Sequence, residues 1–186
     1  MNAYIDSNIL ISYVWYHYFA DDKKKIQPSI VRFTEAMTTK KFNPIVSNFA
    51  LMEVAKHLKD YYILLKVIQN GFGYREFSRL RVDYSVDNAD DQRIKDIIND
   101  IQKDQRFSYM KFTSMETAAF NNIELYIDGY IDFIDAFHLQ LALTAKCDYL
   151  VTKDNEFRSR VKQLAGNRVK GLTVKVMNLD EFLRAL

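Results

Sequence analysis

The sequence predicts an α/β protein of three layers, in which helices cover both faces of a central parallel sheet. Short apolar runs typical of strands alternate along the chain with longer segments of helical periodicity. A strand that returns to the same sheet through a helix pairs in parallel, so this alternation favours an α/β/α architecture. Only five glycines and two prolines occur in 186 residues, which favours long helices and excludes a disordered linker. We therefore expect residues 1–186 to form a single domain.

The first third of the chain predicts a strand–helix–helix–strand–helix order. A helix that begins after the first strand has Asp6, Ser7 or Asn8 as its N-cap, and Ser47 or Asn48 can cap a later helix. Pro28 stands where a helix can begin, because its missing N–H is not needed there. We expect strands at residues 2–5 and 44–46 and helices at residues 7–20, 28–41 and 49–68.

The rest of the chain predicts an interruption followed by further alternation. Residues 70–114 contain two of the five glycines and match no motif, so we expect a mainly helical insertion there. Isoleucines recur at helical spacing inside it, with acids in the first turn. We expect helices at residues 89–105, 115–127, 131–146, 155–165 and 178–186 and strands at residues 109–114, 147–154 and 172–177.

The composition limits the functional classes. The formal charge is +2, which is too balanced to indicate a nucleic-acid-binding protein by itself. Cys147 is the only cysteine, so no internal disulfide can form. The N-terminus lacks the pattern of a signal peptide, and no apolar run reaches the length of a membrane span. We therefore expect a cytoplasmic protein with no membrane partner.

Four acidic residues that are far apart in the sequence are predicted to meet at one edge of the sheet. Asp6 follows the first strand, and Asp154 follows the strand that contains residues 149–151. Glu53 lies in the second turn of a helix that begins at that edge, and Asp135 lies at the start of another such helix. In open α/β sheets, sites form beyond the carboxyl ends of the strands, where strand order reverses.

The clustering of these acids indicates a site for a divalent cation. At ~5 Å and an effective dielectric of ~20, each carboxylate pair costs roughly 3 kcal/mol, so a positive charge must compensate. No histidine or cysteine cluster accompanies them, which argues against zinc and favours Mg²⁺ or Mn²⁺. Such ions can activate water for attack on a phosphodiester, which is the chemistry of a nuclease.

Two segments resemble the PIN domain family. They are "YIDSNIL" near the N-terminus and "DFIDAFHLQLALTAKCDYLVTKDNEF" near the C-terminus, together with the helix that carries Glu53. PIN domains are mostly metal-dependent ribonucleases, and many small ones are the toxins of VapBC toxin–antitoxin pairs. The resemblance implies an RNA substrate, a small antitoxin partner and a homodimer. It also implies that Asp6, Glu53, Asp135 and Asp154 are the catalytic, metal-binding acids, and that Asn8 and Thr152 are supporting polar groups.

Several residues have a second interpretation. Asp6 and Asp154 could each cap a helix, and Glu53 could be an ordinary exposed glutamate. Asp132 is one turn from Asp135 and could assist or replace it as a ligand. His138 lies one turn after Asp135. We interpret it as an imidazole packed under the sheet rather than as a proton carrier or hydrogen-bond partner.

A basic and aromatic segment offers a contact with RNA. Arg75, Arg79 and Arg81 alternate with aromatic residues, a combination that suits phosphate contacts and base stacking. A solvated surface would have much the same composition. The alternatives to a toxin ribonuclease are a PIN nuclease of RNA processing or turnover, which needs no antitoxin, and a catalytically silent RNA-binding scaffold.

Overall fold

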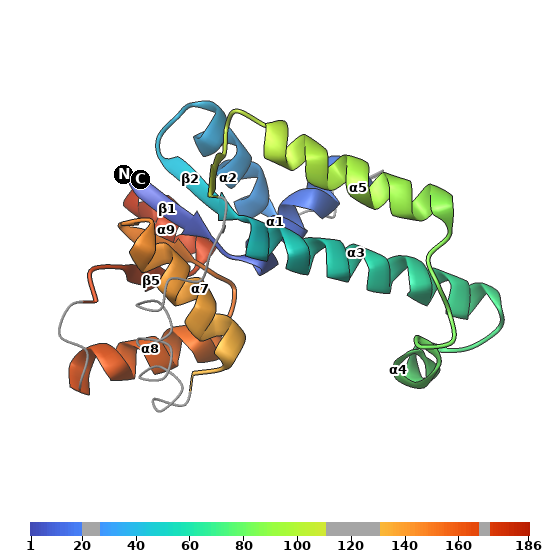
Figure 1. Ribbon diagram of the computed structural model, residues 1–186. Helices are drawn as coiled ribbons and strands as arrows, with labels where there is room; N and C mark the ends of the chain where they lie inside the picture. Colours follow the sequence, from blue (N-terminus) through green and yellow to red (C-terminus); the bar gives the residue numbers. More distant parts are fainter. Residues whose placement is uncertain (20–26, 111–130, 168–171) are drawn as a thin grey trace.

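The computed structural model describes residues 1–19, 27–110, 131–167 and 172–186, which form a parallel five-stranded sheet between two layers of helices (Figure 1). The strands are β1 (Asn2–Ile5), β2 (Asn43–Ser47), β3 (Ser108–Met110), β4 (Tyr149–Val151) and β5 (Lys175–Met177). The longer helices are α1 (Ser7–Val14), α2 (Pro28–Thr38), α3 (Asn48–Gln69), α5 (Asn88–Lys103), α7 (Phe133–Thr144), α8 (Asn155–Asn167) and α9 (Leu179–Ala185). Shorter helical segments are η1 (Trp15–Phe19), η3 (Tyr74–Glu76) and α4 (Phe77–Leu80). The helix expected over residues 115–127 lies outside the described residues.

The strand order determines where a site can form. The strands lie in the order β3-β2-β1-β4-β5, and every neighbouring pair is parallel. Tyr4 in β1 is in register with Ile45 of β2 and with Leu150 of β4. The chain builds the sheet outward from β1 to β3 and then returns to add β4 on the other side of β1. The order therefore reverses between β1 and β4, where ligands bind in sheets of this type.

Side chains alternate across β1 and divide the core into two parts. Ala3 and Ile5 belong to a buried cluster that also contains side chains of α1, α2, α3, α5 and α9. Tyr4 points to the opposite face, where the buried cluster contains side chains of α7 and α8. This alternation is the ordinary consequence of the pleat of a strand. The expected three-layer α/β/α fold is confirmed.

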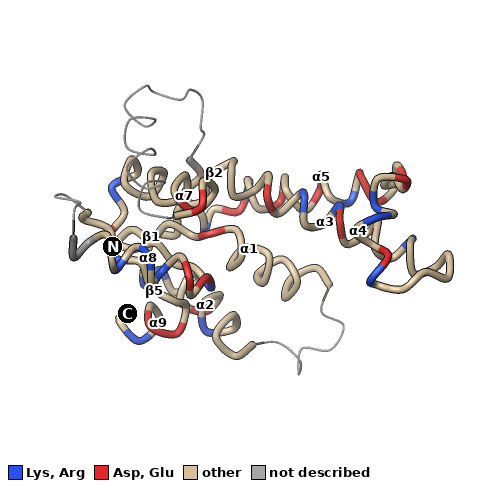
Figure 2. The backbone as a smooth tube through the Cα atoms, turned by 90° about the horizontal axis from the view of Figure 1, so that it is seen from below, with Lys and Arg blue, Asp and Glu red and all other residues tan. Residues whose placement is uncertain are grey.

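Residues 70–110, the described part of the insertion predicted at residues 70–114, pack closely against the rest of the fold. They are mostly helical, as expected, but Ile94, Ile97 and Ile101 of α5 belong to the main core. β3 pairs with β2 as the edge strand of the sheet. Only η3 and α4 stand apart, at the far end of the pair formed by α3 and α5 (Figure 1). Acidic and basic residues are mixed along α3, α4 and α5 instead of forming a surface of one sign (Figure 2).

The first helix is shorter than expected. α1 ends at Val14, and the next five residues form a π-helix, η1. Trp15 and Phe19 of this segment pack against Tyr61 of α3. Within the described ranges, no helix combines the length and the apolar character that crossing a lipid bilayer requires.

Candidate functional site

The predicted acidic residues lie at the edge of the sheet where β1 and β4 end. The backbone N–H of Asp6 donates to the carbonyl oxygen of Val151 at 3.1 Å, which continues the pairing of the two strands by one residue. The chain after β1 enters α1, and the chain after β4 passes through Thr152 and Asp154 into α8. Two loops, 146 residues apart in sequence at Asp6 and Thr152, are thus side by side.

The Asp6 carboxylate is buried, with 3% of the residue exposed, and is held by several donors. Thr152 Oγ1 donates to Oδ2 at 2.5 Å, and Asn8 Nδ2 donates to the same oxygen at 2.6 Å. Ser7 Oγ donates to Oδ1 at 3.3 Å. Asp6 occupies the N-cap position of α1, but its side chain makes no capping hydrogen bond. The side chain is therefore bonded to groups at the edge of the sheet and does not cap the helix.

Asn8 and Thr152 form a network that fixes the two loops to each other. Asn8 Nδ2 also donates to Thr152 Oγ1 at 2.9 Å, and Asn8 Oδ1 accepts from the backbone N–H of Lys153 at 2.9 Å. Thr152 Oγ1 accepts from the backbone N–H of Asp154 at 3.0 Å. Both residues therefore fix the Asp6 side chain by hydrogen bonds, and their role as supporting groups of a metal site stays a prediction.

Glu53 is brought to Asp6 by a histidine. His138 Nε2 lies 2.6 Å from Glu53 Oε2 and 3.3 Å from Asp6 Oδ1. One ligand atom from each of these three residues lies within 4.8 Å of the other two, so the group could hold a metal ion. The Glu53 side chain is 22% exposed, whereas that of His138 is 2% exposed.

The charges around His138 outweigh the effect of its burial. Burial alone would lower the pKa of the imidazole, because it penalises the cation. The hydrogen bond with Glu53 and the charges of Asp6, Glu53 and Asp135 raise that pKa, and the net result is a pKa above the ordinary value. The sequence interpretation of His138 as a packed imidazole is correct about its burial and misses its contacts with two acids. No spacing in the sequence indicates these contacts, because Glu53 is 85 residues away along the chain and Asp6 is still further away.

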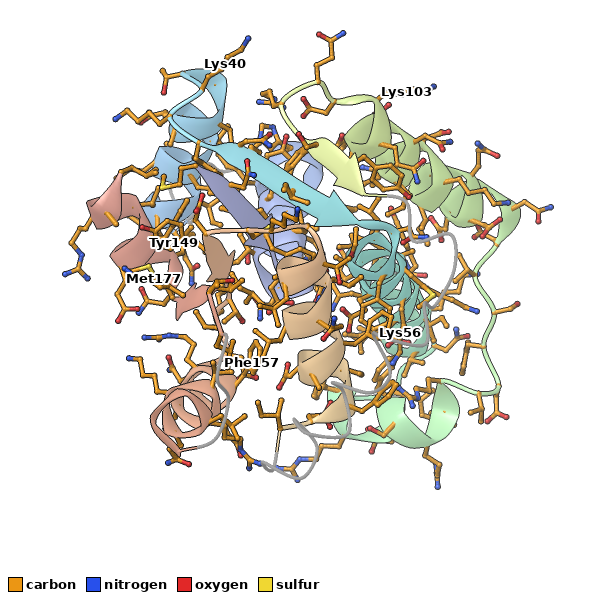
Figure 3. All side chains as sticks on the ribbon, turned by 60° about the vertical axis from the view of Figure 1, so that its left-hand side comes forward. Lys40, Lys56, Lys103, Tyr149, Phe157 and Met177 are labelled. Atoms are coloured by element: carbon orange, nitrogen blue, oxygen red, sulfur yellow. The ribbon has the colours of Figure 1, made fainter. Side chains whose placement is uncertain are left out.

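Asp135 and Asp154 line an adjacent pocket of about 560 Å³. Burial raises the pKa of Asp135 to about 7, and the charges of Asp154, Asp6 and Asp132 contribute to the increase. Figure 3 labels Phe157, which lies on α8 and forms part of the apolar wall of this pocket. Ile131, Ile134, Glu156 and Arg160 complete the lining together with Asp132.

Two of these acids also cap helices. Asp154 Oδ1 accepts from the backbone N–H of Phe157 at 2.8 Å in the first turn of α8. Asp132 is exposed, and its Oδ1 accepts from the backbone N–H of Ile134 at 2.9 Å at the start of α7. The capping alternative considered for Asp154 therefore coexists with its place in the pocket, and Asp132 caps the helix that carries Asp135.

The structure brings the four predicted acids to one edge of the sheet, in two neighbouring groups. Asp6 and Glu53 are joined by His138, while Asp135 and Asp154 share the pocket. The effect of Asp6 on the pKa of Asp135 shows that the two groups interact electrostatically. In the described part of the chain, the only ion pairs of these acids are the two with His138.

The predicted arginines lie far from the acids. Arg75, Arg79 and Arg81 belong to the segment of η3 and α4 at the distal end of α3. Sixteen residues separate Glu53 from Gln69, the last residue of α3, which corresponds to about 24 Å along the helix axis. These arginines do not line the acidic site, and their contact with RNA stays a prediction.

Comparisons with known proteins identify the fold and the family. A family model described as "PIN domain" matches residues 3–162. No curated protein matches the chain. A chain of the crystal structure of VapBC2 from Rickettsia felis, bound to a DNA fragment from their promoter, is similar in structure, with a TM-score of 0.51 and 13% sequence identity. This similarity covers 96% of the present chain and 98% of that chain.

Proposed function

Since the chain belongs to the PIN domain family, we propose that it is a divalent-metal-dependent ribonuclease, which hydrolyses phosphodiester bonds at the edge of the sheet where β1 and β4 end. The convergence of four carboxylates from four different elements supports the proposal most strongly. In this proposal Asp6, Glu53, Asp135 and Asp154 hold the metal ion.

The residues present are suited to a hard divalent cation. Asp6 and Glu53 offer carboxylate oxygens within 4.8 Å of each other, and such oxygens are the ligands that Mg²⁺ and Mn²⁺ prefer. His138 Nε2 belongs to the same group, so the expectation that no histidine accompanies the acids is wrong for this one residue. Burial and, after it, the charges of Asp154, Asp6 and Asp132 raise the pKa of Asp135, so a bound cation would favour its ionised form. The one cysteine, Cys147, is buried in the core between the sheet and α7, so it offers no thiolate to the site.

The chain itself supplies position and charge to the reaction. When bound, a divalent cation supplies Lewis-acid activation of water and stabilisation of the leaving oxygen. Thr152 and Asn8 fix the orientation of Asp6, and His138 holds Glu53 beside it. Asp154 is fixed by the N-terminus of α8 through its capping hydrogen bond. These contacts reduce the rearrangement needed to reach a reactive geometry.

The surroundings of the acids support an unpaired nucleic acid as substrate. Phe133 and Ile134 are 47% and 44% exposed beside Asp135, and Met52 is 60% exposed beside Glu53. Aromatic and apolar side chains in such positions can stack on bases that are not paired in a duplex. Arg160, which lines the pocket and pairs with Glu156, provides a cation for a phosphate group.

A toxin of a toxin–antitoxin pair is the biological role that we propose. The structural similarity to a chain of VapBC2 supports it, because VapBC systems pair a PIN toxin with an antitoxin. In this role the protein acts on RNA in the cytoplasm, is neutralised by a small antitoxin protein and forms a homodimer. Mg²⁺ or Mn²⁺ is the expected cofactor.

Cleavage of a labelled single-stranded RNA by the purified chain, with and without Mn²⁺, tests the proposed activity. We expect the cleavage to require the metal. Asp6→Asn should lower the cleavage rate by at least about 100-fold, because loss of a metal ligand should cost at least as much as loss of a residue that only supports a ligand, which costs up to about 100-fold. Asp91→Asn is a matched control, because Asp91 is an exposed residue of α5 whose ion pair with Lys95 is also exposed. This control should cleave like the wild type.

Two results would contradict the proposed activity. Equal cleavage by wild type and Asp6→Asn would identify a contaminating nuclease. RNA binding without cleavage under any metal would favour the silent scaffold instead.

Expression in bacteria tests the proposed role as a toxin. We expect the wild type to stop growth, Asp6→Asn to permit it, and co-expression of a small neighbouring gene to restore growth of cells with the wild type. Metal-dependent cleavage in vitro without growth arrest would instead favour a nuclease of RNA processing or turnover.

A further inference from the structure

We propose that His138 is a positioning residue, and that a buried chain of side chains, Ser47–Tyr4–His138, holds the Glu53 carboxylate beside Asp6. The chain consists of three hydrogen bonds in series, from Ser47 to Tyr4, from Tyr4 to His138 and from His138 to Glu53. The role in metal binding rests on the proposed function, whereas the positioning itself can be measured without metal.

The geometry of this chain is short and closed to water. The Tyr4 hydroxyl lies 2.7 Å from Ser47 Oγ and 2.9 Å from His138 Nδ1, and His138 Nε2 lies 2.6 Å from Glu53 Oε2. Ser47 and Tyr4 are 0% exposed and His138 is 1% exposed. Buried hydrogen bonds that have no competing water restrict the side chains that they join.

The hydrogen-bonded series Ser47–Tyr4–His138 contacts the beginning of α3 at two points. Ser47 is the N-cap of α3, and its Oγ accepts from the backbone N–H of Ala50 at 3.1 Å. Glu53 lies three residues further along the same helix. Tyr4 comes from β1, Ser47 from the end of β2, Glu53 from α3 and His138 from α7, so these hydrogen bonds join four elements.

The hydrogen-bonding capacity of the groups indicates which nitrogen of His138 carries a proton. His138 Nε2 is close to two carboxylates, which accept but do not donate when ionised, so Nε2 carries a proton. The Tyr4 hydroxyl lies between Ser47 Oγ and His138 Nδ1 and can donate to either, so each of these three groups has a hydrogen-bond partner.

Without this restraint, nothing in the described residues fixes the end of the Glu53 side chain. His138 is its only hydrogen-bond or ion-pair partner there, and 22% of the side chain faces solvent. A glutamate on a helix has several rotatable bonds and gains entropy when it is released. Loss of the restraint should thus reduce metal affinity, because the Glu53 carboxylate is still present but no longer held in place as a ligand.

Calorimetric titration of the folded protein with Mn²⁺ tests this inference. We expect His138→Leu to weaken binding by about 10- to 100-fold and Tyr4→Phe by about 10-fold, the range known for partners of metal ligands. His138→Gln should restore much of the affinity, because its amide N–H reaches toward Glu53 as Nε2 does. Tyr4→Phe changes one hydroxyl group, so it remains informative if His138→Leu does not fold.

Tyr62→Phe is the matched control for Tyr4→Phe. Tyr62 is a buried residue of α3, 7% exposed, and its hydroxyl has no hydrogen-bond partner in the described part of the chain. Removal of this hydroxyl should leave the Mn²⁺ affinity unchanged within about two-fold, since no bond is lost. Unchanged affinity in both Tyr4→Phe and His138→Leu, with a wild type that binds Mn²⁺, would overturn the proposal. Nitrogen coupling in the electron paramagnetic resonance spectrum of bound Mn²⁺ would also overturn it, because His138 would then be a ligand.

Two measurements without metal separate this inference from the proposed function. The ¹⁵N spectrum of the imidazoles, assigned by the absence of one signal in His138→Gln, should show a protonated Nε2. In a double-mutant cycle, Tyr4→Phe should cost less unfolding free energy in a Glu53→Ala background than in the wild type. Among the hydrogen bonds of the described residues, Tyr4 and Glu53 are joined only through His138, so additive effects would contradict the inference even if the protein bound no metal.

Discussion

The two halves of the acidic site are built differently. Asp6 is buried and receives hydrogen bonds from Thr152 and Asn8, and His138 connects it with Glu53. Asp135 instead faces a pocket, and burial together with neighbouring acids raises its pKa to about 7. The protein therefore surrounds one half with its own hydrogen-bond donors, whereas in the other half burial and neighbouring acids disfavour the ionised form of Asp135. Four variants, compared in metal-free protein, can test this difference.

Asn8→Asp should have the largest effect, because it replaces a donor to Asp6 by a second carboxylate. The donor lies 2.6 Å from Asp6 Oδ2, and two carboxylates ~5 Å apart at an effective dielectric of ~20 repel by about 3 kcal/mol. We expect a comparable loss in the free energy of unfolding by urea at pH 7. The loss should diminish near pH 4, as carboxylates become protonated. Asn99→Asp, at an exposed position of α5, is the control. A loss of the same size at both pH values would mean that shape and not charge is responsible.

Thr152→Val should destabilise the protein by about 2 kcal/mol, because a buried hydroxyl with several partners is removed at nearly constant volume. Its Oγ1 donates to Asp6 and accepts from Asn8 and from the backbone N–H of Asp154. Thr38→Val removes an exposed helical hydroxyl that bonds only to the carbonyl oxygen of Thr34, and should change stability much less. Urea denaturation measures both variants. Equal effects would show that the network around Asp6 contributes no particular stability.

Asp135→Asn should make the protein more stable at pH 8 and leave it nearly unchanged at pH 4. An acid whose pKa is raised in the folded state binds a proton on folding, so stability falls as pH rises from the unfolded value of 3.8 to about 7. Asp135→Asn has no titrating group at this position, so its stability should not fall for this reason as the pH rises. Because solvent screens the group, we expect a gain of about 1 kcal/mol at pH 8. Urea denaturation across this pH range measures it, and a pH-independent difference between the two proteins would refute the explanation.

Asp154→Asn should have the smallest effect on stability and a clear effect on Asp135. Asparagine caps helices as well as aspartate does, so the change in unfolding free energy should stay within about 0.5 kcal/mol. Removal of the charge should lower the pKa of Asp135, since Asp154 is the largest of the charges that raise it. A ¹³C titration of the Asp135 carboxyl group measures this shift. An unchanged pKa would show that the two acids do not interact.

The position of the acids could be predicted from the sequence because it follows from strand order. The strand expected at residues 2–5 forms β1, and of the two expected caps, Ser47 and Asn48, Ser47 is the N-cap of α3. In a parallel sheet these boundaries place Asp6 and Glu53 at the same edge. No knowledge of side-chain contacts was needed for that step.

The contacts that connect the acids could not be predicted in this way. His138 meets Glu53 and Tyr4 across three elements, and no spacing along the chain indicates which buried hydroxyl faces which imidazole. The place of β3 in the sheet is similar. A strand was expected at residues 109–114; β3 covers Ser108–Met110 and pairs with β2, and residues 111–114 lie outside the described residues. A pattern so short does not specify whether its segment joins the sheet or lies in an insertion.

The position of β1 between β2 and β4 also has a consequence for synthesis. Asp6 leaves the ribosome before Thr152 and Asp154, which complete its surroundings and follow about 146 residues later. An incomplete chain therefore carries its first acid without the neighbours that orient it. If the finished protein cuts RNA, this order of assembly keeps the growing chain harmless to the messenger from which it is being translated.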